Sequence, residues 1–294
     1  MASVIKPSKS DRAFNVFVVA SLVLLFIILF IPIWSTITLS FRPNDFIGSA
    51  LDGMTLPPWR WSVAAFRALL GNNSFVKATI NSFRIFFEGI AAALLLTTPL
   101  AYALSIKTLP GRKFLYLFVI IPYLFDVGLV PNYLLVTGLG LTNKLAAVYL
   151  PGAISVYNTL IMKSFFEGIP EELKESARID GASEFTVLMR IILPLSKPIM
   201  LTIGLYYGVR FWNDFFNAML YLNDSALQPL PILLRNILLS SGMNEYVEVS
   251  AFGEAPIEAI KAASVLLAAI PMLVAYPFIQ KYFVKGTMLG SLKG

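Results

Sequence analysis

The chain of 294 residues contains no cysteine and no histidine. It therefore has no disulfide, no zinc site with His or Cys ligands, and no Ser-His-Asp or Cys-His nucleophile. It also lacks the Gly-x-x-x-x-Gly-Lys-Ser/Thr sequence of a nucleotide-binding P-loop. If the protein works with ATP, another polypeptide must hydrolyse the nucleotide. We therefore assign it no catalytic residue, no metal ligand and no cofactor of its own.

Charge is also scarce. Only 14% of the residues are charged, 57% are hydrophobic and the mean hydropathy is +0.74. The net charge of +6 comes from Lys and Arg scattered at the ends of apolar segments. This distribution is typical of membrane topology and differs from the clustered cations of a nucleic-acid groove.

Long apolar runs predict an all-α integral membrane protein, because a run of 18 or more apolar residues is long enough to span a bilayer. We predict six transmembrane helices, at residues 14–41, 80–106, 114–136, 145–166, 198–222 and 261–284. The third is the most irregular, since Pro122 and Pro131 interrupt it. Such breaks are tolerated where neighbouring helices or water satisfy the freed backbone groups. We treat 1–294 as one transmembrane domain, with an N-terminal span 14–41 and a core 80–284 that includes a loop 167–197.

The distribution of cations predicts the orientation. The first apolar run is too long for a signal-peptide core, so it should remain as a span. With the N-terminus inside, the cytoplasmic segments and their span ends hold 14 Lys and Arg, against seven outside. This excess favours a multi-pass protein of the bacterial cytoplasmic membrane with both termini in the cytoplasm.

A charged island, residues 171–194, lies between the fourth and fifth predicted spans. Pro170 suits the first turn of a helix, and acidic residues follow it where the helix dipole favours them. Gly181 can end this helix in the left-handed conformation, and Ser183 can cap the next one. Pro194 should set a bend before the fifth span. An ordinary amphipathic helix at the membrane surface is the alternative interpretation of such a segment.

The island resembles the loop by which permease subunits of ABC importers dock on their ATPase, through the spacing of Glu175, Ala177, Gly181 and the Ile-x-Leu-Pro ending at Pro194. Together with the six spans and the tail from Phe283, the chain resembles MalG-type permease subunits of carbohydrate-uptake importers. The resemblance implies a coupling helix in the island. It assigns the ATPase contacts to Glu172, Glu175, Ala177, Arg178, Asp180 and Gly181.

The same resemblance implies partners. They are a second, homologous permease subunit, two ATPase subunits that carry ATP and Mg, and an extracytoplasmic sugar-binding protein. The substrate would be an oligosaccharide, with an acidic, alginate-like saccharide as the nearest match. Alternating access, driven by ATP, would move it across the membrane.

Five ionisable residues fall inside predicted spans and should face the bundle or a wet cavity. Arg84 with Glu88 and Arg210 with Asp214 are spaced i,i+4, so each pair could neutralise itself on one helix face; Asp126 is the fifth. These charges could hold helices together or line a sugar path. Aromatic and planar polar groups suit a saccharide, and the candidates are Tyr157, Asn158, Arg210, Trp212, Asn213, Asp214 and Asn217.

Two long outer loops remain. The second, which begins at Asn223, is polar enough to meet the binding protein, with candidate contacts Ser240, Ser241, Gly242 and Asn244. It could also be a plain connector.

Two other classes stay open on the residues alone. An ion-gradient-driven secondary transporter could use Glu88, Asp126 and Asp214 as a proton or sodium path. Such a carrier, however, has no use for the charged island. A membrane enzyme would need an Asp pair or a Ser-Lys pair, and none is evident.

Overall fold

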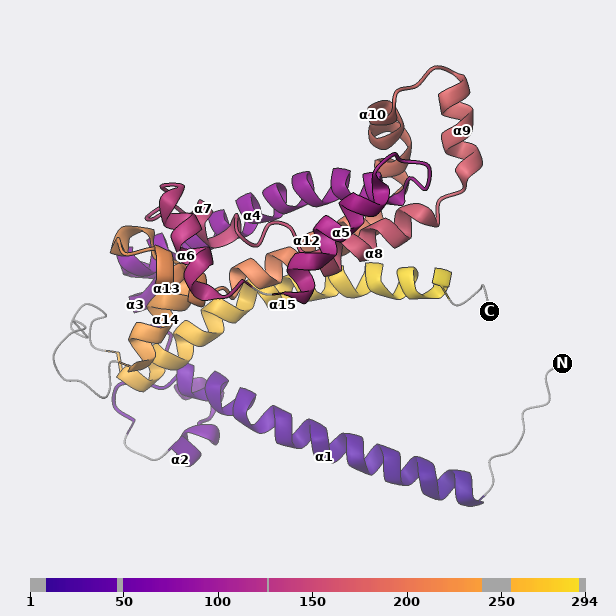
Figure 1. The fold of residues 1–294 in the computed structure, drawn as a ribbon. Helices are drawn as coiled ribbons and strands as arrows, with labels where there is room; N and C mark the ends of the chain where they lie inside the picture. The colour runs from indigo at the N-terminus through magenta and orange to yellow at the C-terminus, as the bar shows by residue number, and fades with distance from the viewer. Residues whose placement is uncertain (1–8, 47–49, 126, 240–254, 291–294) are drawn as a thin grey trace. The chain divides into compact units, whose positions relative to one another are not determined.

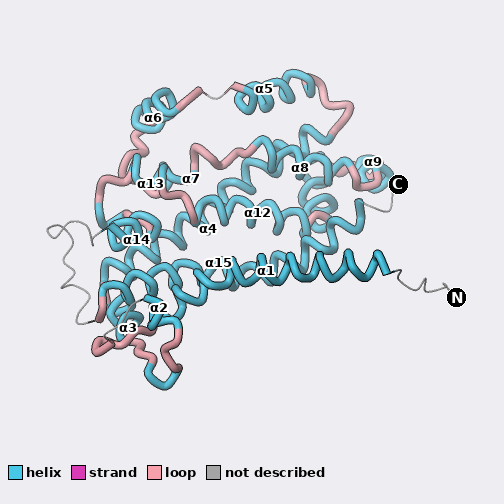
Figure 2. The backbone as a smooth tube through the Cα atoms, turned by 90° about the horizontal axis from the view of Figure 1, so that it is seen from below, coloured by secondary structure: helices cyan, strands magenta, loops and turns pink. Residues whose placement is uncertain are grey.

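Every regular element of the described chain is a helix. A computed structural model describes residues 9–46, 50–125, 127–239 and 255–290, and within these ranges no strand occurs (Figure 2). The structure divides into two units, residues 1–72 with 240–268 and residues 73–239 with 269–294.

The first unit begins with the long apolar helix α1, Lys9–Ser40 (Figure 1). Three short helices follow it: α2 (Ala50–Met54), η1 (Pro58–Arg60) and α3 (Ala64–Gly71). The Phe41 ring stacks on Trp61 at 4.8 Å between centroids, and its carbonyl accepts a hydrogen bond from Ser62 N at 2.8 Å. Trp61 is therefore packed against Phe41, whereas the neighbouring Trp59 of η1 is 85% exposed.

The second unit is built on α4, Asn73–Ser105, which packs most extensively against two other helices (Figure 1). These are α8 (Val156–Glu167) and α12 (Lys197–Trp212). Gly208 of α12 makes close approach possible, because a Cβ there would lie 2.6 Å from a ring carbon of Phe86. Gly204 and Gly208 of α12 both face side chains of α4, the arrangement of a small-xxx-small contact.

A buried hydrogen-bond network joins the same elements. The hydroxyl of Tyr207, whose side chain is fully buried, lies 2.8 Å from Thr97 Oγ1 on α4. It also accepts a bond from the main-chain N–H of Ser155 at 2.8 Å. Polar groups inside an apolar bundle are costly unless they are bonded, so this network fixes the relative positions of α4, α12 and the segment before α8.

The apolar runs do not all form single helices. In the second unit the remaining elements are α5 (Arg112–Leu124), α6 (Leu129–Gly138), α7 (Ala146–Tyr149), α9 (Glu171–Ile179), α10 (Glu184–Val187), the π-helical turn η2 (Leu188–Ile192), α11 (Leu193–Leu195), α13 (Phe216–Tyr221), η3 (Ser225–Leu227) and α14 (Leu230–Leu239). The last helix, α15 (Ile257–Gly290), belongs to both units.

Three helices of the described chain are long and apolar enough to cross a membrane, or five if each bent pair counts as one span. The three lie at Phe14–Ser40, Asn73–Ser105 and Ile257–Pro277, and agree with the first, second and sixth predicted spans. The third span is split into α5 and α6, which meet at 117°. The fifth starts after an 85° bend and its helix ends at Trp212, ten residues before the predicted end.

The fourth predicted span is also interrupted. α7 has four residues and α8 has twelve, and the chain between them runs through Pro151 to Ser155. The side chain of Ser155 caps α8 by accepting a bond from Asn158 N. Proline and an N-cap serine thus replace one continuous helix by two short ones.

Candidate functional site

The charged island forms a helix-turn-helix at one end of the second unit. α9 starts after Pro170, which lies at the N-cap, one position before the predicted first turn. At its other end the N–H of Gly181 bonds to Arg178 O and the N–H of Ala182 to Ala177 O, at 3.0 and 2.9 Å. Gly181 has φ +81°, so the predicted left-handed stop is confirmed and completes a Schellman motif.

The second arm of the island begins at Ser183, whose side chain accepts a hydrogen bond from Thr186 N. This confirms the predicted N-cap. The helix then loosens into the π turn η2 before Pro194. The 85° bend into α12 falls at Ser196, two residues beyond the proline to which the sequence assigned it. The π turn absorbs the backbone change near Pro194, which lets the helix continue to Leu195.

Arg178 ties the two arms together. Its guanidinium donates to Glu184 at 2.7 Å on α10 and to Glu171 at 2.9 Å at the start of α9. The hydrogen bond from Arg178 is the largest cause that lowers the pKa of Glu184. For Glu171 the pKa is lowered first by Lys174 and then by Arg178. Both carboxylates are therefore ionised near neutral pH, and the island is held as one piece.

The island is also anchored to the bundle. Lys174 is 3% exposed, and its ammonium donates to Glu171 at 2.9 Å and to the carbonyl of Phe166 at 3.4 Å. The hydroxyl of Tyr102, near the end of α4, donates to Glu184. No pattern in the sequence indicates either anchor, because both depend on where the island folds against the bundle.

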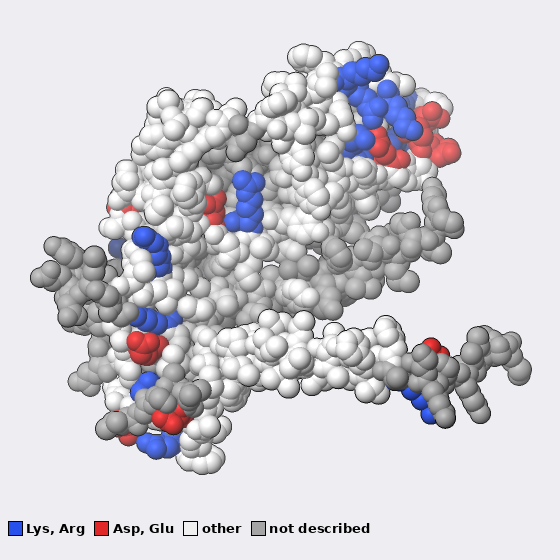
Figure 3. Space-filling view, turned by 60° about the horizontal axis from the view of Figure 1, so that its bottom comes forward, with Lys and Arg blue, Asp and Glu red and all other residues white. Residues whose placement is uncertain are grey.

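The island's outer face is acidic and apolar. Figure 3 shows Lys, Arg, Asp and Glu side chains gathered over one end of the molecule, where the island's ion pairs lie. Glu172, Glu175, Asp180 and Gly181 are exposed, whereas Ala177 and Arg178 are partly buried and contribute to the island's own structure. Sequence reasoning missed three exposed apolar side chains, Leu173 (46%), Ile179 (86%) and Phe185 (71%).

A second polar cluster lies along α4, α7 and α12. Arg84 pairs with Glu88 at 3.2 Å, as the spacing predicted, and Tyr149 also donates to Glu88 at 3.3 Å. Arg210 stands against Gly152 and donates to its carbonyl at 3.4 Å. Arg210 has no carboxylate within 4 Å among the residues that the structure describes.

The predicted pair between Arg210 and Asp214 is wrong. α12 ends at Trp212, so the i,i+4 geometry of a helix no longer applies. Asp214 instead accepts from Asn217, from the main-chain N at 3.0 Å and from Nδ2 at 2.7 Å. Its carboxylate thus caps the short helix α13.

The other predicted path residues do not share one environment. Tyr157 is 58% exposed, whereas Asn158 is 6% exposed. Trp212 is buried and its ring meets Phe83 edge-on at 5.0 Å. Asn213 is exposed and donates to Val209 O at 2.8 Å. Trp212 and Asn158 are therefore buried within this chain, while Tyr157, Arg210 and Asn213 are accessible.

The second of the predicted outer loops is only partly described. Its first part folds back onto α4, where Asn81 donates to the carbonyls of Ala226 and Gln228 at 2.9 and 3.3 Å. The four predicted binding-protein contacts, Ser240, Ser241, Gly242 and Asn244, lie outside the described residues, and so does Asp126.

Comparison with known proteins adds independent information. Residues 6–288 match the family of binding-protein-dependent transport system inner membrane components. The polygalacturonan/rhamnogalacturonan transport system permease YtcP of Bacillus subtilis is 38% identical over 97% of this chain and 99% of its own length. Protein LplC of the same organism is 41% identical over 81% of both chains.

A solved structure has the same fold. It is a chain from the crystal structure of a bacterial ABC transporter involved in the import of the acidic polysaccharide alginate. The TM-score is 0.86 at 26% identity, over 95% of this chain and all of the other. From the match over nearly its whole length, this chain belongs to the family of inner-membrane permease components of binding-protein-dependent ABC transport systems.

Proposed function

We propose that this protein is the permease subunit of an ATP-driven importer of acidic oligosaccharides, with the charged island as its coupling helix. It would work with a second permease, two ATPase subunits that bind ATP and Mg, and an extracytoplasmic sugar-binding protein. The observation that carries the proposal is the island: a preformed helix-turn-helix with exposed Glu172, Glu175 and apolar side chains, anchored to the bundle by Lys174 and Glu184.

The island's construction suits the transmission of force. A displacement of α9 would pass through Arg178 and Glu184 to α10, and through Tyr102 to α4. The buried side chains of Val187 and Ile192 belong to the same apolar core as α4 and α8. Because packed cores shift between discrete arrangements, a push on the island would reorient helices of the bundle.

The membrane topology follows from counting broken spans as crossings. We count α1, α4 and α15 as one crossing each, the bent pair α5–α6 as one, α12 after its 85° bend as one, and α7 with α8 as the sixth. Irregular backbone at membrane depth is tolerated where protein or water covers it, so the breaks in the third to fifth crossings would have to be covered by partner subunits or face water. Six crossings place the island on the side of both termini, which the excess of Lys and Arg assigns to the cytoplasm.

An acidic substrate is supported by Arg210. Its guanidinium is accessible and makes one long hydrogen bond to a carbonyl, whereas Arg84 is already neutralised by Glu88. Because Asp214 forms no ion pair with Arg210, a carboxylate of the saccharide could pair with this guanidinium. Relatives that carry polygalacturonan, rhamnogalacturonan or alginate in their names agree with this substrate class.

The proposal is tested with the complete importer in liposomes, by measuring ATP hydrolysis with and without loaded binding protein. Glu175→Lys changes an exposed residue that makes no ion pair in the described chain, so it should abolish stimulation without unfolding the island. Gly181→Pro should also abolish stimulation, because proline prevents the left-handed turn. Lys107→Glu, a charge change of the same size and opposite sign on an exposed residue before α5, is the control and should be stimulated normally.

Normal assembly and stimulation in both island variants would show that the island is only an interfacial helix. Failure of the chain to associate with any ATPase would favour an ion-driven carrier. For the substrate, Arg210→Gln should weaken uptake of an acidic oligosaccharide and leave a neutral one unchanged. Equal uptake of the acidic substrate by both proteins would contradict the role of Arg210.

A further inference from the structure

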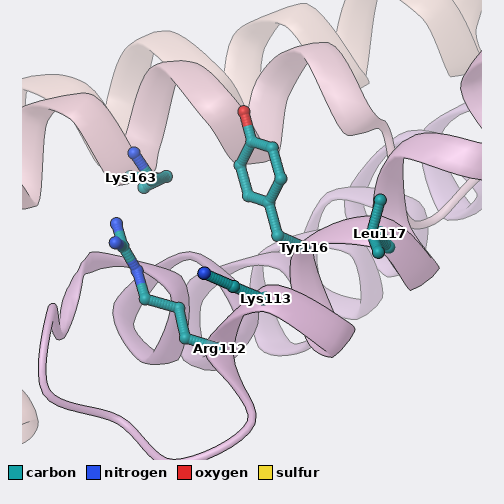
Figure 4. A pocket seen from close by; sticks show the side chains of 5 residues that line it. All are labelled: Arg112, Lys113, Tyr116, Leu117 and Lys163. Carbon is teal, nitrogen blue, oxygen red and sulfur yellow. The ribbon is translucent and has the colours of Figure 1, made fainter.

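A basic cavity of about 420 Å³ lies where the start of α5 meets α8. Its walls are Arg112, Lys113, Tyr116 and Leu117 from α5 and Lys163 from α8. Figure 4 shows Arg112 reaching toward Lys163, with Lys113 and Tyr116 beside them. The cavity lies within the second unit, and none of its residues belongs to the island's outer face or to the Arg210 cluster.

The positive charge of this cavity is only partly balanced. Arg112 and Lys163 share the single carboxylate of Glu167, at 2.8 and 2.9 Å. Lys113 is exposed and has no ion-pair partner in the described ranges. Three cations against one carboxylate leave a local charge of about +2, enough to attract a phosphate group.

An apolar stripe continues from the cavity along α5. Phe114, Leu117, Phe118 and Ile121 are 76%, 55%, 68% and 52% exposed, and their spacing places them on one face of the helix. Leu117 belongs to both the stripe and the cavity. In a membrane protein, such a face is covered by acyl chains or by another helix.

We propose that this cavity binds the headgroup of an anionic phospholipid, in the leaflet on the island's side of the membrane, with its acyl chains along the α5 stripe. Basic pockets between helices at that membrane surface recognise lipid phosphates. The cations of the cavity together with the apolar stripe favour a lipid, because a free phosphate would bind the cations but make no contact with the stripe. Glu167 stands four residues before Glu171, so the bound lipid would brace the junction between α8 and the island.

The test measures lipid retention by native mass spectrometry of the complete importer, purified in detergent and titrated with phosphatidylglycerol or with phosphatidylcholine. Lys113→Gln removes one cation and leaves the Glu167 pairs intact. Lys107→Gln is the matched control, since Lys107 is exposed in the same region but does not line the cavity. Thermal unfolding of the assembled variants verifies that both are folded.

We expect phosphatidylglycerol to be retained in preference to phosphatidylcholine, and Lys113→Gln to weaken its retention about fivefold, the effect of one cation near a membrane surface. Lys107→Gln should bind as the wild type does. Equal weakening in both variants would mean that lipid retention depends on the general surface charge, and it would overturn the proposal. Equal retention of the two lipids, or no effect of Lys113→Gln, would also overturn it. Displacement of the lipid by millimolar inorganic phosphate in a competition arm would assign the cavity to a free anion instead.

Discussion

Replacing Gly181 by alanine tests how the island is held in shape. A Cβ at Gly181 would meet no atom within 4 Å, so the substitution causes no clash. Its cost is the left-handed conformation at φ +81°, which disfavours an L side chain by about 1–2 kcal/mol. Alanine also lowers the entropy of the open chain, which returns about 0.4–1 kcal/mol. The expected net loss is about 1 kcal/mol.

Hydrogen exchange followed by mass spectrometry would measure this loss in the assembled importer. The N–H groups of Gly181 and Ala182 make the two bonds of the Schellman motif, so their exchange reports opening of the turn. Exchange in a peptide spanning 171–187 should be about fivefold faster in Gly181→Ala, and less accelerated in Gly181→Asn, because asparagine tolerates this conformation better. Equal exchange in wild type and both variants would refute the view that a left-handed glycine holds the turn.

Three further predictions concern the bundle and the ion pairs. Gly208→Ala should lower the thermal unfolding midpoint, because its methyl would lie 2.6 Å from an aromatic carbon of α4, whereas Gly204→Ala, at 3.4 Å, should change little; equal midpoints would contradict this packing. Tyr207→Phe removes a buried hydroxyl and leaves the Ser155 N–H without its acceptor, which should cost about 1–3 kcal/mol in the same assay; an unchanged midpoint would contradict the role of this hydrogen bond. Arg178→Ala should destabilise the island by at most about 1 kcal/mol, since its partners are half exposed. Because Arg178 lowers the pKa of Glu184, the stability lost in Arg178→Ala should stay constant above the ordinary pKa of a glutamate, about 4.3. It should vanish as the pH falls through the lower pKa of Glu184 in the folded protein; a change between pH 6 and 8 would argue against the pair.

The features that the sequence predicted correctly have local causes. Gly181 and Ser183 mark the island's turn because glycine favours the left-handed region and a serine hydroxyl bonds the first N–H groups of a helix. The helices α1, α4 and α15 follow from long apolar runs. The pair of Arg84 and Glu88 formed because its helix continues through both residues.

The features that were missed depend on contacts between distant segments. An apolar run does not tell a straight helix from a broken one, and the third to fifth predicted spans are all interrupted. The predicted ion pair of Arg210 with Asp214 does not form, because α12 ends at Trp212. The burial of Lys174 requires the end of α8 as a partner, which no pattern in the island itself reveals.

Cross-linking would test the central claim most directly, because this chain has no cysteine and a single introduced one can be labelled on it before the importer is assembled. Ser176→Cys places a thiol on the exposed face of α9, and Lys107→Cys serves as the control outside the island. Each would carry a short photoactivatable cross-linker in the complete importer. We predict that the label at Ser176 captures an ATPase subunit and abolishes stimulated hydrolysis, while the control does neither. An assembled, active importer in which the Ser176 label captures only lipid would contradict the assignment of the island as the coupling helix.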